Sequence, residues 1–223
     1  MQIGFKIHSR AEMPDTSLLE LLRGIPTPII SDNMARMFAV GPALRPYHRG
    51  GALIGFALTV RTRPGDNLMV HKAIDLAQPG DVIVVDAGGD VTNAIVGEIM
   101  TTLAESRGVA GMVIDGSVRD LDAIAASDFP VYARGITHRG PYKDGPGEIN
   151  VVVSVGGQTI APGDIVVGDA DGVLAVPRSE AIQVAELARV QMDREAAILR
   201  AIRDRTIDRS WVDEMLRSKG LQT

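Results

Sequence analysis

The chain has 223 residues, a net charge of −5 at pH 7 and no cysteine. Its apolar content of 45% and charged content of 23% are ordinary for a globular protein. The acidic balance, without a basic stripe, argues against a nucleic-acid-binding protein, and the lack of cysteine excludes disulfides and thiolate chemistry. No signal-peptide run or membrane-length apolar stretch occurs, so we expect a cytoplasmic protein without membrane contact.

The first third of the chain predicts three helices and one long strand. Residues 16–23 read as a short helix that Thr16 or Ser17 can cap, and Thr27-Pro28 opens a second helix. Residues 52–63 are rich in strand-forming side chains, and residues 67–77 return to helical spacing.

The middle of the chain alternates between buried strands and helices. The predicted strands are 81–86, 110–115 and 130–134, and the predicted helices between them are 94–107 and 119–126. Strand–helix–strand alternation with nearly continuous apolar strands indicates a parallel α/β layer.

After residue 135 the pattern changes to a long loop, 135–149, and then to short strands. The predicted strands are 151–155, 158–160, 165–167 and 173–176, with hairpin signals at Gly156-Gly157 and Asp171-Gly172. A long helix, 179–203, follows, and Ile182, Ala185, Val190, Ala196 and Leu199 are expected to face the core.

These elements predict an α/β protein, a single-domain α/β/β sandwich with a parallel α/β layer and an antiparallel β layer. We expect an N-terminal helical segment at 1–26, a catalytic domain at 27–203 and a C-terminal tail at 204–223.

The segment Gly116-Ser117-Val118-Arg119-Asp120 is the best candidate for chemistry. It follows a predicted strand, and ligands of α/β sheets bind at the carboxyl ends of strands. A guanidinium can grip a carboxylate or an oxyanion with two hydrogen bonds, and a carboxylate can hold Mg²⁺ together with water. The alternative interpretation is a surface ion pair at a helix start.

Other motifs give weaker signals. The run Asp86-Ala87-Gly88-Gly89-Asp90 could let backbone amides approach an anion, or could be a plain turn. It resembles the start of an S-adenosylmethionine site, but the glycine-rich loop is incomplete. The histidines show no metal-ligand spacing, and His71 is expected to be structural.

Several runs together resemble a known family: PGDVIVVDAGG, then GE at 97–98, then RGVAGMVIDGSVRD. They are similar to the class II pyruvate aldolases that act on 4-hydroxy-4-methyl-2-oxoglutarate and 4-carboxy-4-hydroxy-2-oxoadipate. These belong to the superfamily of the regulator of ribonuclease E activity A. The family signature is an acidic residue, twenty further residues and then Arg-Asp, which Glu98, residues 99–118 and Arg119-Asp120 reproduce. Glu98 stands where some of these aldolases have Asp.

The resemblance implies a role for each of these positions. Asp120 would hold Mg²⁺ or Mn²⁺, and Arg119 would bind the oxo acid and polarise its C2 oxygen. The helix start at Gly97, with the amides of Ile99 and Met100, would receive the substrate carboxylate. Glu98 would position a water that protonates the enolate. The last residue implied is Glu195, which would reach the site of a neighbouring subunit in a homotrimer or homohexamer.

The sequence therefore predicts a metal-dependent lyase that releases pyruvate from 4-hydroxy-2-oxo acids and decarboxylates oxaloacetate. A lysine Schiff base is the other route to a stabilised enolate, but the internal lysines, Lys72 and Lys143, show no sign of burial. The alternative function is a non-enzymatic protein that binds and regulates a ribonuclease.

Overall fold

The computed structural model describes residues 3–10 and 15–221. Its strands are β1 (Phe5–Ile7), β2 (Arg45–Pro46), β3 (Leu53–Thr62), β4 (Asp81–Asp86), β5 (Ala94–Val96), β6 (Gly111–Val118), β7 (Val131–Ile136), β8 (Gly147–Ile149), β9 (Val153–Val155), β10 (Gln158–Ile160), β11 (Ile165–Asp169) and β12 (Gly172–Val176). Its helices are α1 (Ser17–Leu22), α2 (Thr27–Asn33), α3 (Leu68–Leu76), α4 (Glu98–Ser106), α5 (Leu121–Ala126), α6 (Ala181–Arg203) and α7 (Ser210–Ser218), with a 3-10 turn at Arg178–Glu180.

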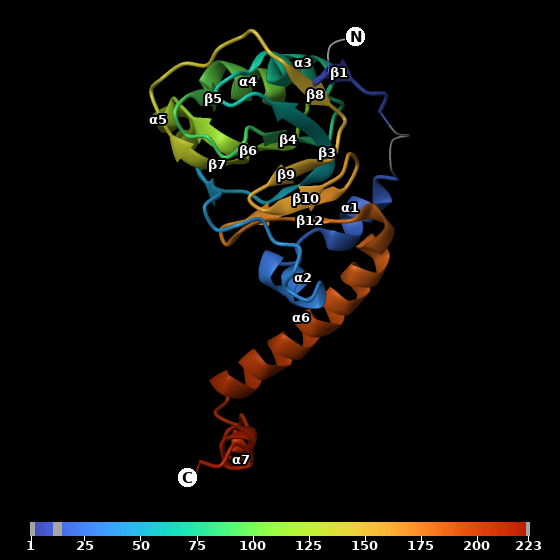
Figure 1. Ribbon diagram of the computed structural model, residues 1–223. Coiled ribbons are helices and arrows are strands. Elements are labelled where there is room, and N and C mark those ends of the chain that lie inside the picture. The colour runs from blue at the N-terminus through green and yellow to red at the C-terminus, as the bar shows by residue number, and fades with distance from the viewer. Residues whose placement is uncertain (1–2, 11–14, 222–223) are drawn as a thin grey trace.

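The elements stack in layers, which confirms the predicted α/β class (Figure 1). Helices α3, α4 and α5 lie on one face of a sheet in which β3, β4, β6 and β7 run parallel in that order. Beyond its other face lie the antiparallel pairs β9–β10 and β11–β12. Helices α1, α2 and α6 cover the far side of this second β layer and add a helical layer to the predicted sandwich.

Strand β3 belongs to both β layers. Its first residues, Leu53–Phe56, pair antiparallel with β11. Its remaining length, from Phe56 to Arg61, pairs parallel with β4. Residues 53–60 are buried apart from half-buried Ile54, as expected for a strand enclosed on both faces.

Three clusters of buried side chains fill the spaces between the layers. One lies between α3–α5 and the parallel sheet and includes Ile74, Ile83 and Ile114. A second separates the two β layers and contains the fully buried Tyr132, whose hydroxyl donates to the carbonyl of Asp169 at 2.8 Å. The third packs α1, α2 and α6 against β11 and β12. Because apolar side chains fill the interior, we look for polar, potentially catalytic side chains at the edges of the layers.

Two predicted helices begin later than the sequence suggested. The predicted helix 94–107 is wrong at its start, because Ala94–Val96 form β5 and the helix begins at Glu98. Ile95 and Val96 are β-branched residues, which favour strands, and the segment that contains them pairs with β6. The predicted helix 119–126 is wrong in the same way, since β6 runs to Val118 and α5 begins at Leu121.

Two further expectations need correction. The predicted loop 135–149 contains the end of β7 and the short strand β8, which pairs with β1 and β3. On α6 the buried residues are Ala181, Val184, Ala185 and Ala188, while Ile182, Val190 and Leu199 are exposed. Both predicted hairpins form, as the pairs β9–β10 and β11–β12 show. The second turn is at residues 170–171 rather than at the predicted Asp171-Gly172, because Gly172 begins β12 and pairs with Asp169.

Regular structure occurs near both ends of the described residues. Strand β1 pairs with β8 near the N-terminus, and α7 lies beyond α6 near the C-terminus (Figure 1). The division at residues 26 and 203 stays a prediction. Within the described ranges, no helix combines the length and apolar character needed to cross a bilayer.

Candidate active site

Asp120 occupies an unusual backbone position at the end of β6. Its φ and ψ are 60° and 45°, the left-handed region, which Asp tolerates better than most residues with a Cβ. The preceding amide, Arg119 N–H, donates to the Val96 carbonyl at 3.0 Å, so β5 holds the end of β6. The turn therefore directs both side chains toward the segment that links β5 to α4.

That segment is Gly97, and only glycine fits there. A Cβ on Gly97 would lie 2.3 Å from Asp120 Oδ2 and 2.9 Å from Arg119 Cγ. The close approach lets Asp120 Oδ2 accept a hydrogen bond from Glu98 N–H, the first residue of α4, at 3.0 Å. Arg119 Nε lies 3.7 Å from the same oxygen. Asp120 thus caps α4 from another segment of the chain, and its Oδ1 has no hydrogen-bond partner among the residues that the structure describes.

These residues border a cavity of about 220 Å³. Its walls come from the start of α3, from β5 and α4, from the end of β6, and from the loop between β7 and β8. The lining residues are Asn67, His71, Ile95, Val96, Gly97, Ile99, Met100, Arg119, Asp120, Pro141 and Lys143. The side chains of Arg119 and Asp120 are 42% and 41% exposed, so the pair is open to a ligand.

The electrostatics of the cavity are cationic on balance. Burial, and after it the charge of Lys143, lower the pKa of His71 below its ordinary value, while Asp75 acts weakly in the opposite direction. A neutral His71 leaves Arg119 and Lys143 as the cations of the lining and Asp120 as its carboxylate. Such a cavity suits an anionic ligand.

Asn67 contributes an unmatched hydrogen-bond acceptor. The residue is 2% exposed, and its Nδ2 donates to the Ile95 carbonyl at 2.9 Å, which fixes the orientation of the amide. Its Oδ1 is buried and has no hydrogen-bond partner in the described part of the chain. A buried acceptor without a donor costs free energy, and a ligand that donates a hydrogen bond to Oδ1 would remove that cost.

The amides at the start of α4 are not equally available. Met100 N–H donates to the Gly97 carbonyl at 3.0 Å, and Glu98 N–H is taken by Asp120. Within the described residues, Ile99 N–H has no hydrogen-bond acceptor. Of the two amides predicted to receive a carboxylate, that of Ile99 is the one free to do so, and the helix dipole favours an anion there.

The two predicted glutamates lie apart from each other. Glu98 is exposed at the start of α4, beside the cavity rather than in its lining. Glu195 lies on α6, across both β layers from α3 and α4, and accepts a hydrogen bond from Gln191 at 2.8 Å (Figure 1). A single chain therefore does not bring Glu195 to the cavity.

The donor set agrees with a hard divalent cation held by few protein ligands. Among the described residues, no cluster of three His, Asp or Glu suited to a metal occurs. Magnesium, however, commonly takes one or two carboxylates and completes its octahedron with water and substrate oxygens. The free oxygen of Asp120, at the mouth of a cationic cavity, fits that mode.

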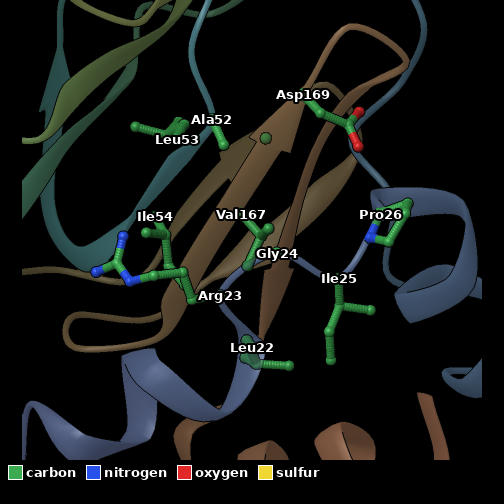
Figure 2. A pocket seen from close by; sticks show the side chains of 11 residues that line it. Leu22, Arg23, Gly24, Ile25, Pro26, Ala52, Leu53, Ile54, Val167 and Asp169 are labelled. Atoms are coloured by element: carbon green, nitrogen blue, oxygen red, sulfur yellow. The ribbon is translucent and has the colours of Figure 1, made fainter. Parts of the chain in front are cut away.

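Other candidate features have structural roles. Gly88 N–H donates to Asp86 Oδ1 and Gly89 N–H to the Asp115 carbonyl, so of the two interpretations of residues 86–90 the structure favours the plain turn. A second hollow of about 250 Å³ lies between the segment following α1, β3 and β11 (Figure 2). Its carboxylate, Asp169, is occupied by the amide and hydroxyl of Thr27, and its lining is mostly apolar. That hollow offers packing rather than chemistry.

The similarity to known proteins covers most of the folded core. The family model RraA-like, described as Aldolase/RraA, matches residues 27–175. The chain belongs to the RraA-like family. A relative from Halalkalibacterium halodurans, named "Putative 4-hydroxy-4-methyl-2-oxoglutarate aldolase", is 41% identical over 195 residues, which are 87% of this chain and 93% of the relative.

Solved RraA-like structures share the fold. An uncharacterized protein from Pseudomonas syringae has a TM-score of 0.78 at 28% identity, covering 87% of this chain and 96% of its own. RraAS2 from Streptomyces coelicolor, described as an unusual member of the RNase ES inhibitor RraA protein family, has a TM-score of 0.76 at 26% identity, covering 83% and 97%. The family thus contains proteins named as aldolases and proteins named as ribonuclease inhibitors.

Sequence reasoning did not assign three polar residues of the lining, Asn67, His71 and Lys143, to the site. Asn67 directly precedes α3 and His71 lies four positions later in its first turn, so the two residues are on the same side of the helix, and this spacing could have indicated them. Lys143 lies in a loop rich in glycine and proline, where no periodicity indicates the direction of a side chain.

Proposed function

We propose that this protein is a divalent-metal-dependent lyase that cleaves 4-hydroxy-2-oxo acids to pyruvate and also decarboxylates oxaloacetate. The observation that carries the proposal is the meeting of Arg119, Asp120 and the start of α4 in one cavity, with one Asp120 oxygen left free. The aldolase name of the 41% identical relative supports it.

In this proposal Asp120 holds Mg²⁺ or Mn²⁺, because a lone carboxylate without Cys or a His cluster suits hard cations. The bound metal would supply stabilisation of negative charge on the oxygens of the enolate. Arg119 binds the 2-oxo oxygen, where its planar donors favour the developing oxyanion. The Ile99 amide, beside Gly97 and Met100, receives the C1 carboxylate.

Cleavage then needs two proton movements. The 4-hydroxyl gives its proton to a water held by Glu98 as the C3–C4 bond breaks, which gives a carbonyl product and the enolate of pyruvate. A water held by Glu98 returns a proton to C3. Asn67 Oδ1 offers an acceptor to the 4-hydroxyl of the bound substrate. Oxaloacetate reaches the same enolate by loss of carbon dioxide.

The decisive experiment is a pyruvate-release assay with 4-hydroxy-2-oxoglutarate and oxaloacetate, before and after exhaustive chelation and after readdition of Mg²⁺ or Mn²⁺. We expect release that disappears with chelator and returns with either metal. Release that continues unchanged without metal, or no release from either substrate, would contradict the proposal.

A second candidate is a regulator that binds a ribonuclease, favoured by the likeness to RraAS2. Such a function would use a protein-binding surface and would survive loss of the Asp120 carboxylate. A stable ribonuclease complex that is unaffected by Asp120→Asn, with no release of pyruvate by the wild type, would favour this candidate.

A further inference from the structure

We propose that Lys143 selects substrates with a second carboxylate by pairing with the acid group at the end remote from C1. This inference rests on the proposed lyase function and adds a specificity residue to it. The evidence is how firmly the Lys143 loop is fixed, where its cation lies relative to Arg119, and its lack of a protein partner.

The loop that carries Lys143 is fastened to the start of α3. The carboxylate of Asp66 is fully buried, and its Oδ2 accepts the amides of Asp144 at 2.7 Å and Gly145 at 2.9 Å. Tyr142 N–H donates to the Gly65 carbonyl at 2.8 Å, and Asn67 N–H donates to the Tyr142 carbonyl at 3.0 Å. The backbone on both sides of Lys143 is therefore held, and the lysine is presented from a fixed position.

The same loop passes the Arg119 guanidinium. A Cβ on Gly140 would lie 3.2 Å from Arg119 Nη1. Lys143 follows three residues later, so its Cα lies within roughly 11 Å of the Cα of Gly140 even for an extended chain. Both cations line one cavity. With Arg119 at the 2-oxo oxygen, as in the proposed function, Lys143 in the loop between β7 and β8 is the cation left for an acid group remote from C1.

Lys143 forms no salt bridge with any residue that the structure describes. Within the described residues, no carboxylate lies close enough to form a salt bridge with it, whereas Arg63 is the cation paired with neighbouring Asp144. The effect of Lys143 on the pKa of His71 indicates that its charge is felt inside the cavity. The ammonium is thus free for a ligand, and neutral His71 adds no second charge on that side.

The test compares two substrates that differ at one end. 4-Hydroxy-2-oxoglutarate ends in a carboxylate, and 4-hydroxy-2-oxopentanoate carries a methyl group in its place. We expect Lys143→Met to lower kcat/KM for the diacid about tenfold, mainly through KM, since a hydrogen bond to a charged group is being lost. The monoacid should change less than twofold, and Lys143→Arg should keep most of the diacid preference.

Lys72→Met is the matched control. Lys72 lies on α3 next to His71 but borders a different groove, with Phe5 and Met69. We expect that variant to treat both substrates as the wild type does. Equal losses on both substrates in Lys143→Met, or an unchanged diacid preference, would overturn the inference while leaving the lyase function intact.

A binding measurement separates this inference from catalysis. 2-Oxoglutarate and 2-oxopentanoate lack the 4-hydroxyl and serve as uncleaved ligands, titrated with Mg²⁺ present and followed by the NMR signal of the His71 ring. Wild-type protein should bind the diacid about tenfold more tightly, and Lys143→Met should bind both alike. Equal affinities in the wild type would overturn the role of Lys143 whether or not the protein releases pyruvate.

Discussion

Asp120 combines a local structural role with the proposed chemistry. Its left-handed backbone and its hydrogen bond from Glu98 N–H hold the start of α4, and its other oxygen is free. Substitutions can separate these roles, because Asn keeps the backbone preference and the acceptor oxygen but removes the charge.

We therefore predict that Asp120→Asn loses pyruvate release at least a hundredfold while its thermal midpoint stays within about 2 °C of the wild type. Asp120→Ala should be equally inactive and also less stable, by about 1–2 kcal/mol, because it loses the cap and strains the turn. Coupled-enzyme assays and thermal melts check both variants. An active Asp120→Asn protein would reduce the Arg119–Asp120 pair to a surface ion pair.

Gly97 tests the close approach directly. Gly97→Ala should displace Asp120 and lower kcat/KM at least tenfold, since the new Cβ would lie 2.3 Å from the carboxylate oxygen. Gly50→Ala is the matched control, because a Cβ there meets nothing within 4 Å. Steady-state kinetics of the two variants decide the matter, and similar activity in both would show that the approach is not needed.

His71 provides a pH-dependent readout. Burial and then Lys143 lower its pKa, so folded protein holds it neutral at a pH where the unfolded chain, with a pKa of about 6.5, begins to bind a proton. Titration of His71 therefore lowers the free energy of unfolding as the pH falls below about 6.5. An NMR titration should place the midpoint of His71 below 6.5 and should move it upward in Lys143→Met. A midpoint at or above 6.5 in the wild type would contradict this prediction.

At the scale of elements, the sequence predicted for most segments whether they are helices or strands. It did not predict where the elements that border the cavity begin and end. The alternation of buried strands and helices predicted the parallel layer, and the paired turn residues predicted both hairpins. The spacing of Glu98, Arg119 and Asp120 marked the site through a resemblance. The whole of β5 and the extension of β6 to Val118 were missed, because the pairing between these two strands decides them and local propensity does not.

Contacts between distant segments account for the rest. Asp66 looks like an ordinary turn residue in the sequence, yet it is fully buried and fixes a loop that lies far along the chain. No periodicity reports a bond between residues 66 and 144, and so the cavity wall that carries Lys143 could not be predicted.

Asp66 supplies the prediction at this scale. Asp66→Ala should lower the free energy of unfolding by about 3 kcal/mol, because it leaves three backbone amides, one buried and two part-buried, without their acceptor. Asp144→Ala, at a position 76% exposed, should change it by less than about 0.5 kcal/mol. Urea unfolding of both variants gives the comparison, and equal stabilities would show that the loop is not held in this way.

At the scale of the whole molecule, α6 is a helix whose apolar side chains a single chain leaves partly uncovered. It runs away from the layered body (Figure 1), and Ile182, Val190 and Leu199 expose 55%, 70% and 51% of their surface. We propose that copies of the chain cover this helix in a homotrimer or homohexamer, and that Glu195 then reaches a neighbouring cavity.

Mixing experiments test that arrangement. Asp120→Asn and Glu195→Gln proteins should each be inactive, and allowing their subunits to exchange should restore part of the activity, because some sites would combine two intact residues. Sedimentation should show trimers or hexamers. A fully active monomer, or unchanged kinetics in Glu195→Gln, would contradict the shared site.

Strand β3 bears on how the protein unfolds. Because one strand is paired with β11 in one layer and with β4 in the other, neither layer can separate without breaking the other's hydrogen bonds. The layers should therefore lose structure together, in one cooperative transition, despite the length of the chain. In hydrogen exchange, the amides of β3 should be among the slowest, open only through global unfolding, and exchange there would report the stability of the entire fold.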